Sequence, residues 1–327
     1  MPNTKPVFYK GKNHGSFDEE WGCHRRISEW WYATGYFKDE NSRMYSYQYT
    51  LLRPRIYSIQ SSVIMIALTD FETGKHYYMQ KITLLHHKIA IDSRAARFDD
   101  LASLEKNKNG MKLNIDYKDF SLDLTLEYGK GAFWHGDNGL LRMGIDAPGE
   151  TTVYFSYTNM PTSGALKLDG KTFRVVGKSW FDKQGGPYRI IQRHTHWEWF
   201  SLRFFDDEEI MLFTFPQSRY QDGTYIPGNN HSRRLTHYSI TPLEFVDVNG
   251  LTFSSSWSLS VPGVKEEIYN IKPLMPGQFN FAYFELLAGI YNSGGMQVGL
   301  CFVELLPGVH NRKYTINLLK RVGRQNE

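Results

Sequence analysis

The sequence predicts an all-β protein built from two antiparallel β-barrels that arose by internal duplication. Three observations support this prediction. The segment 28–47 is echoed without a gap at 196–215, an offset of 168 residues in a chain of 327. Short segments that read as strands, separated by turn residues, recur through both halves. Aromatic residues, which favour strands and can line apolar pockets, make up 15% of the chain.

Each copy of the echoed segment reads as an aromatic strand, a tight acidic turn and a second aromatic strand. At the fixed offset Trp31 corresponds to Trp199, and Asp39 in the turn corresponds to Asp207. A sequence repeat at an offset of about half the chain length indicates two copies of one fold. We therefore expect residues 28–47 and 196–215 to superpose as equivalent strand pairs.

The remaining strands are predicted from alternation and from turn signals. Candidate strands are 44–52, 62–69, 76–85, 111–117 and 120–128 in the first half, and 197–205, 210–215, 234–240, 252–260, 279–288, 296–305 and 313–320 in the second. Many short strands at regular spacing indicate barrels or sandwiches, and an aromatic interior favours closed barrels that hold an apolar ligand. Weak helical spacing at 94–107 predicts a short helix or an irregular crossing, and 1–27 an extended lead-in.

The length of the chain suits two domains. We place the division at the Gly185-Gly186-Pro187 turn, just before the second echo, which gives an N-terminal domain of residues 1–185 and a C-terminal domain of 186–327.

Composition excludes several functional classes. The net charge of +4, from 38 basic and 34 acidic residues, is too weak and dispersed to indicate a nucleic-acid partner. Cys23 and Cys301 form no C-x-x-C pair, so neither a zinc nor a redox motif is expected. No signal-peptide pattern and no apolar run long enough to span a membrane occur, so we expect a cytoplasmic protein. The oligomeric state stays open.

Asp182 is the most informative ionisable residue. It follows Trp180 and Phe181 on a predicted strand, beside a large apolar surface. If its side chain faces inward, burial raises its pKa and suits it to general acid catalysis. The alternative is that Asp182 caps a turn before Gly185.

Two other groups of residues invite competing interpretations. Glu29 is either a buried acid or the ion-pair partner of Arg25 or Arg26. His194 and His196 share one face of a strand, but the acid that a cupin-like metal site requires three or four residues later is absent. We therefore expect no metal and no cofactor.

Several blocks, in order from about residue 14 to 306, resemble the AttH-like and carotenoid 1,2-hydratase family. The matching blocks are Glu29–Tyr32, Gly136–Arg142, Tyr154–Thr158, Gly177–Asp182, Trp197–Phe200 and Tyr283–Glu304. The resemblance implies a pair of lipocalin-like β-barrels. The family includes hydratases that add water to isoprenoid double bonds, a fungal kievitone hydratase and fungal Diels–Alderases that form decalins.

The resemblance also implies roles for residues. In the carotenoid hydratases a Tyr-x-Asp pair is implicated in protonating the alkene, and Trp180 and Asp182 occupy the matching positions here. The strand that matches the family's His-x-Trp pair contains no histidine. The candidate catalytic residues are Asp182, Glu29 and Tyr157. The candidate substrate-binding residues are Trp31, Tyr32, Tyr47, Trp180, His196, Glu198, Trp199 and Tyr283.

We expect Trp31, Tyr157, Trp180, Trp199 and Tyr283 to belong to the core and to the pocket. At least three of these aromatic residues are predicted to contact one cavity together with Asp182. Alternation along a strand places Glu29 and Trp31 on a shared face, and it does the same for Trp180 and Asp182, so each pair enters the pocket together or not at all.

Three functions fit this sequence. The first is a cofactor-independent lyase or isomerase that hydrates or dehydrates an alkene in a terpenoid or polyketide. This chemistry needs a proton donor and aromatic faces that stabilise a carbocation. The second is pericyclic cyclisation, which needs a shaped cavity and a hydrogen bond or two to a carbonyl. The third is a carrier, which needs only apolar cavity walls.

Overall fold

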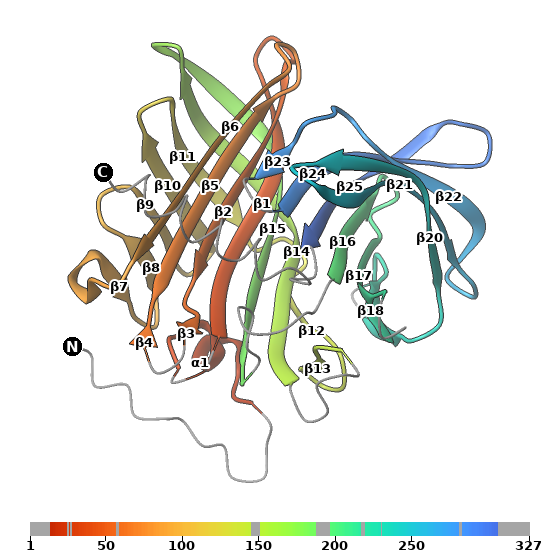
Figure 1. Ribbon diagram of the computed structural model, residues 1–327, viewed down its shortest axis with the longest axis horizontal. Coiled ribbons are helices and arrows are strands. Elements are labelled where there is room, and N and C mark those ends of the chain that lie inside the picture. The colour runs from red at the N-terminus through yellow and green to blue at the C-terminus, as the bar shows by residue number, and fades with distance from the viewer. Residues whose placement is uncertain are drawn as a thin grey trace.

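The computed structural model describes residues 14–306 apart from 25, 27, 57–58, 145–150, 188–196, 217–219, 230 and 281–282. The described chain is almost entirely β-strand, arranged as two curled antiparallel sheets that lie side by side (Figure 1). In this part of the chain, no helix has the length and hydropathy needed to cross a membrane. The predicted strand at 313–320 lies outside the described residues.

The first sheet follows the order β6-β5-β2-β1-β15-β14-β11-β10-β9-β8-β7, with β12 and β13 paired to β14. Its strands are β1 (Ser28–Asp39), β2 (Met44–Leu52), β5 (Ser62–Asp70), β6 (Lys75–Thr83), β7 (Ile89–Ile91), β8 (Ala95–Phe98), β9 (Ala102–Lys106), β10 (Gly110–Tyr117), β11 (Phe120–Glu127), β12 (Ala132–Trp134), β13 (Leu140–Arg142), β14 (Thr151–Leu168) and β15 (Lys171–Gly186). A separate small pair consists of β3 (Arg55–Ile56) and β4 (Ile59–Gln60).

The second sheet follows the order β19-β18-β17-β16-β25-β24-β22-β21-β20, with β23 paired to β24. Its strands are β16 (Trp197–Phe204), β17 (Glu209–Phe215), β18 (Tyr220–Ile226), β19 (Arg233–Leu235), β20 (Ser239–Val248), β21 (Leu251–Val261), β22 (Lys265–Pro273), β23 (Phe279–Asn280), β24 (Tyr283–Tyr291) and β25 (Gln297–Leu306). Each sheet curls around a core of its own, and we call these units the first and second barrel.

The connectivity of the two barrels confirms the predicted all-β fold and its internal duplication. In the first barrel β1 lies between β2 and the last strand, β15. In the second barrel β16 lies in the same way between β17 and the last strand, β25. In chain order, β15 is the last strand of the first sheet and β16 is the first strand of the second. We propose that the division into two domains falls there, near residue 186.

The register of the repeat differs from the prediction. In the first hairpin Phe37 pairs with Tyr45, so the hairpin is centred on position 41. In the second, Arg203 pairs with Glu209, which centres the hairpin on position 206. The structural offset is therefore 165 residues (206 minus 41), and the predicted superposition at an offset of 168 is wrong. Aromatic side chains occupy both faces of these strands, so the pattern of aromatic residues could not fix the register.

Two other expectations need correction. The segment 94–107 forms the strands β8 and β9, joined by a turn in which Asp99 has φ 51°. Its apolar residues are buried in the alternation of a strand, with Phe98 and Leu104 in the first core. The lead-in contains the helix α1 (Phe17–Trp21), which begins with a capping box formed by Ser16 and Glu19. A second short helical element, η1, spans His86–Lys88.

Apolar side chains form three clusters. One fills the first barrel and includes Trp31 and Phe181, and another fills the second barrel and includes Phe200. The third cluster lies between the two sheets and includes Trp180 and Trp199. Neighbouring residues on β16 and on the later part of β15 therefore point alternately into a barrel and into the interface, so β16 and residues 179–186 of β15 are buried on both faces.

Candidate active site

Asp182 lies in the interface between the sheets and is only 4% exposed. It does not cap a turn, because β15 continues to Gly186. Three neutral groups donate hydrogen bonds to its carboxyl group. The Tyr154 hydroxyl donates to Oδ2 at 2.9 Å and the Trp180 indole Nε1 to Oδ1 at 2.6 Å, while the Ser156 hydroxyl also donates to Oδ1.

Burial raises the pKa of Asp182 to about 7. The hydrogen bonds from Ser156, Trp180 and Tyr154 oppose this effect because they stabilise the ionised form, and the charge of Glu304 adds a smaller upward contribution. A substantial fraction of the carboxyl group therefore carries its proton near neutral pH. This is the property that a general acid requires.

Aromatic rings surround this carboxyl group. The Trp199 indole Nε1 donates a hydrogen bond of 3.0 Å to the Tyr154 hydroxyl. The ring of Trp199 packs edge-to-face on Trp180, with centroids 6.0 Å apart, and on Tyr32, with centroids 5.6 Å apart. Aromatic faces attract positive charge, so the same rings that bury Asp182 can stabilise a cation formed beside it.

Two further carboxyl groups come from the second sheet. Glu285 on β24 pairs directly with Glu304 on β25. The Tyr32 hydroxyl donates to Glu285, and the Trp197 indole donates to Glu304 at 2.6 Å. Burial raises the pKa of Glu304 to about 6. Burial and then the neighbouring Glu304 raise the pKa of Glu285 well above its usual range.

A chain of hydrogen bonds links Asp182 to the second sheet through His135. The imidazole Nε2 lies 2.7 Å from the Ser156 hydroxyl, and Nδ1 lies 2.8 Å from the Thr224 hydroxyl on β18. Burial lowers the pKa of His135 to about 3, so the ring is neutral. Since Ser156 donates its proton to Asp182, we assign the single imidazole proton to Nε2.

Glu29 lies on the other side of the first sheet, in a cluster of charges. Its Oε1 accepts a hydrogen bond of 2.6 Å from Lys183, and its two oxygens contact His24 at 2.8 and 2.9 Å. Although burial opposes it, the charge of Lys183 leads a set of partners that lowers the pKa of Glu29 to about 2. Arg26, one of the two predicted ion partners, is farther away at 3.9 Å, and Arg25 lies outside the described residues. Glu29 is therefore ionised and does not join Asp182.

Three more of the predicted site residues face the interior of the first barrel. Trp31 and Tyr47 are fully buried in its core, and Tyr157 stacks on Tyr128 with ring centroids 4.6 Å apart. Because Ser156 rather than Tyr157 faces the interface, Tyr157 lies on the side of the sheet opposite Asp182.

The remaining predicted residues are divided among other positions. Glu198 accepts a hydrogen bond of 3.2 Å from Trp257 in the second barrel. Tyr283 lies at the interface, where its hydroxyl accepts a bond of 2.6 Å from Gln48 of the first sheet. His196 lies outside the described residues. Of the predicted set, the structure brings Tyr32, Trp180 and Trp199 together with Asp182.

Sequence reasoning missed Tyr154, Ser156, His135, Glu285 and Glu304. Two signals were present. Glu285 and Glu304 are isolated acids within otherwise apolar strands, and such residues are rarely buried without a function or a partner. Tyr154 and Ser156 share one face of the strand that pairs with β15.

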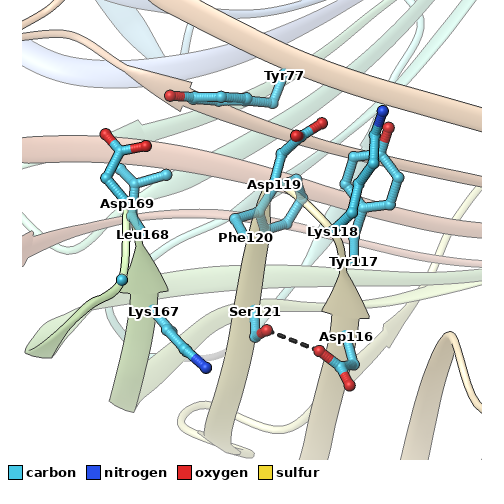
Figure 2. Close-up of a pocket in the computed structure, with 11 residues that line it drawn as sticks. Tyr77, Asp116, Tyr117, Lys118, Asp119, Phe120, Ser121, Lys167, Leu168 and Asp169 are labelled. Atoms are coloured by element: carbon cyan, nitrogen blue, oxygen red, sulfur yellow. Dashed lines mark hydrogen bonds between the residues drawn. The ribbon is translucent and has the colours of Figure 1, made fainter.

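A separate pocket of about 480 Å³ lies at the far end of the first barrel. Figure 2 shows Tyr77 across from Asp119 and Asp169 there, with the lysines 118 and 167 nearby. This pocket contains none of the predicted site residues. It adjoins Gly170, which lies roughly 40 Å along β15 from Asp182 at the rise of an extended strand. We place the candidate site at Asp182 because its chemistry is built from buried, converging groups.

Comparisons with known proteins agree with this architecture. A model of the protein family described as AttH-like matches residues 10–308. A search among curated proteins returned no match.

Solved structures with similar folds include the following three. An AttH protein from Nitrosomonas europaea superposes with a TM-score of 0.81 at 22% identity, covering 93% of this chain and 100% of that one. Kievitone hydratase from Nectria haematococca gives a TM-score of 0.72 at 16% identity, covering 93% and 96% of the two chains. CghA with Sch210972 gives 0.52 at 11% identity, covering 94% of each chain. At these identities the likeness establishes the fold.

Proposed function

Because the chain belongs to the AttH-like family, we propose that it is a cofactor-independent hydro-lyase that adds water to, or removes it from, an alkene in a hydrophobic small molecule. The observation that carries this proposal is Asp182, a buried carboxyl group whose pKa of about 7 leaves it partly protonated among aromatic rings. Terpenoids and polyketides are the substrate classes that suit such surroundings.

In the forward reaction, the Asp182 carboxyl group transfers its proton to one alkene carbon. The π bond breaks, a new C–H bond forms, and the other carbon becomes a carbocation. Trp180, Trp199 and Tyr32 offer ring faces that stabilise this positive charge by cation–π attraction.

Water then attacks the cation, and a base removes one of its protons. We assign this role to Glu304, whose pKa of about 6 leaves it mostly ionised at neutral pH. The product gains one hydrogen and one hydroxyl group, while Asp182 has lost a proton and Glu304 has gained one. After the product leaves, the proton returns to Asp182 by exchange with solvent.

The rival function of a carrier is less well supported. A carrier needs no buried acid, and it would tolerate a site in which Asp182 faced solvent. The side chain is instead buried and accepts three hydrogen bonds. Such an arrangement costs desolvation energy that ligand storage alone does not require.

The first experiment identifies a substrate and the reaction type together. Extracted ligands that co-purify with the protein are identified by mass spectrometry, and a panel of unsaturated terpenoids and polyketides is incubated with the enzyme in ¹⁸O-labelled water. Uptake of one labelled oxygen indicates hydration. An isomer of unchanged mass indicates cyclisation and would reject our proposal, as would hydration that persists undiminished in Asp182→Asn.

A further inference from the structure

A buried arginine in the same interface has no acidic partner among the residues that the structure describes. Arg203 on β16 is 3% exposed, and its guanidinium group lies between the rings of Tyr36 and Phe302, at 5.0 and 5.7 Å from their centroids. Its one hydrogen bond among the described residues runs from Nη1 to the backbone carbonyl of Lys178, at 3.3 Å.

Several donors at this position are unsatisfied. Within the described residues, Nε and Nη2 of Arg203 are fully buried and have no hydrogen-bond partner. The hydroxyl of Ser201, two residues earlier on the same face of β16, is also buried and has no hydrogen-bond partner in the described part of the chain. Glu209, the residue opposite Arg203 on β17, is engaged elsewhere because its oxygens bind Lys130 and Asn159.

This arrangement is costly for the free protein. A buried charge without a counter-ion loses its hydration and gains little in return. Ring contacts recover only part of that loss. A guanidinium edge presented with a hydroxyl group is, however, well suited to bind a carboxylate through charge-assisted hydrogen bonds. One positive charge matches the single charge of a carboxylate better than the double charge of a phosphate.

We propose that Arg203 and Ser201 bind a carboxylate at the end of the substrate remote from the reacting alkene. This inference rests on the proposed function for the identity of the bound molecule as substrate. It narrows the substrate class to hydrophobic monocarboxylic acids.

The positions of the two sites support this assignment. Trp199, whose indole contacts Tyr154 beside Asp182, lies four residues before Arg203 on β16, a separation of roughly 13 Å along a strand. On the facing strand β15, Lys178 lies four residues before Asp182, which gives the same separation. The acid and the arginine therefore both project into the interface, from opposite sheets, at the spacing of a reactive alkene and a polar end in a long hydrophobic molecule.

The competing interpretation is that Arg203 only joins the two sheets by stacking between Tyr36 and Phe302, with water on its free donors. To distinguish the two, we would compare three acids with their methyl esters: farnesoic, retinoic and oleic acid. The affinity of each for the purified protein follows from the ligand-induced shift of the thermal unfolding midpoint. The variants are Arg203→Met, Arg203→Lys, and a matched control, Arg233→Met, which removes an exposed arginine of the same sheet.

For the wild type and for Arg233→Met, we expect at least one acid to bind about tenfold or more tightly than its ester. Arg203→Met should bring this ratio to about one. Arg203→Lys retains the positive charge but loses the planar guanidinium group that can form two hydrogen bonds to a carboxylate, so it should give an intermediate ratio. This variant replaces Arg203→Met in the test if the methionine variant does not fold. The inference is wrong if none of the acids binds wild type better than its ester, or if the preference is undiminished in Arg203→Met or, where that variant does not fold, in Arg203→Lys.

Asp182→Asn separates this inference from the proposed function. It should keep the preference for the acid even though hydration is lost. If no alkene in the panel is hydrated and the acid preference still depends on Arg203, the carboxylate site stands and the hydratase assignment fails.

Discussion

Glu29 and Asp182 are both buried in the first sheet, on the neighbouring strands β1 and β15, yet their carboxyl groups have opposite properties. The pKa of Glu29 falls to about 2, and that of Asp182 rises to about 7. Glu29 faces the side of the sheet where Lys183, His24 and α1 lie, whereas Asp182 faces the interface.

The difference shows that partners rather than burial decide the charge of a buried acid. Both residues lose hydration, which raises the pKa of each. At Glu29 the ammonium group of Lys183, at 2.6 Å, outweighs that loss. At Asp182 only neutral donors are present, and they offset it in part. One sheet thus carries a structural ion pair on one face and a partly protonated carboxyl group on the other.

Removing the proton of Asp182 should have the largest effect. Asp182→Asn preserves the size of the side chain but leaves no transferable acidic proton, so kcat/KM for hydration should fall about 10²–10⁴-fold. Steady-state kinetics on the alkene identified by the panel measure this. A parallel urea titration checks that the variant is folded, and a folded variant with full activity would remove Asp182 from the mechanism.

Removing the partner of Glu29 should instead reduce stability. Lys183→Met leaves a carboxylate buried with weaker partners, and the free energy of unfolding should fall by about 3–5 kcal/mol. Urea denaturation followed by tryptophan fluorescence provides the measurement. The double variant Lys183→Met/Glu29→Gln should recover most of the loss, and a single-variant cost below about 1 kcal/mol would contradict our account of the pair.

The two acids should give stability opposite dependences on pH. The folded-state pKa of Glu29, about 2, is below its ordinary value of 4.5, so its contribution is full above pH 4.5 and is lost as pH falls towards 2. The pKa of Asp182, about 7, is above its ordinary value of 3.8, so its contribution is full below pH 3.8 and is lost as pH rises towards 7. The contribution of each acid to the free energy of unfolding changes by roughly 3–4 kcal/mol at most over its pH range.

Urea unfolding between pH 2 and 8 tests these dependences. Glu29→Gln should flatten the acidic limb of the stability curve, and Asp182→Asn should flatten the limb that approaches neutrality. If either variant flattens the other limb, the assignment of the two pKa shifts is incorrect.

A smaller change should shift the pH dependence of the rate. The proposed hydration needs Glu304 ionised and Asp182 protonated, so kcat/KM should be bell-shaped, with limbs at about pH 6 and 7. Trp180→Phe removes a hydrogen bond that stabilises ionised Asp182, so its alkaline limb should move upward, by about one pH unit. An unmoved alkaline limb, or one displaced downward, would show that the indole does not tune this acid.

The smallest effect is expected at Tyr157. Its ring stacks on Tyr128 inside the first barrel, away from Asp182, so Tyr157→Phe should change kcat/KM by no more than about twofold. A larger loss in a variant of unchanged stability would restore the catalytic role that the sequence suggested for this tyrosine.

The fold was predictable because strand spacing, turns and duplication are local signals that agree with one another. Asp182 was predictable for a similar reason, since Trp180 lies on its own strand and face. The environment of Glu29 was not, because its partner Lys183 lies 154 residues away and only strand pairing brings them together. Sequence reasoning left two interpretations open, a buried acid or the ion-pair partner of Arg25 or Arg26. Glu29 is buried and Arg26 lies 3.9 Å away, but neither interpretation named Lys183.

The pairing of Glu285 with Glu304 could not be predicted from the sequence for a related reason. Glu285 and Glu304 become neighbours only through the register of β24 and β25, and they meet Tyr32 only when the sheets pack. The spacing of aromatic residues could not show which face of a strand lies in the interface, because strands that are buried on both faces carry large apolar residues on both faces. The same ambiguity produced the error of three residues in the register of the repeat.

Burial of β16 and β24 on both faces also determines how the molecule opens. Every residue of β16 is buried, against the second core on one side and the first sheet on the other. The amide protons of these strands should exchange with heavy water only when the whole molecule unfolds. If the halves on either side of residue 186 were produced separately, Trp180 and Trp199 would be exposed to solvent, and we expect the halves to aggregate. The two barrels are thus repeated in topology, and we expect them to unfold as one cooperative unit, with Asp182 buried between them.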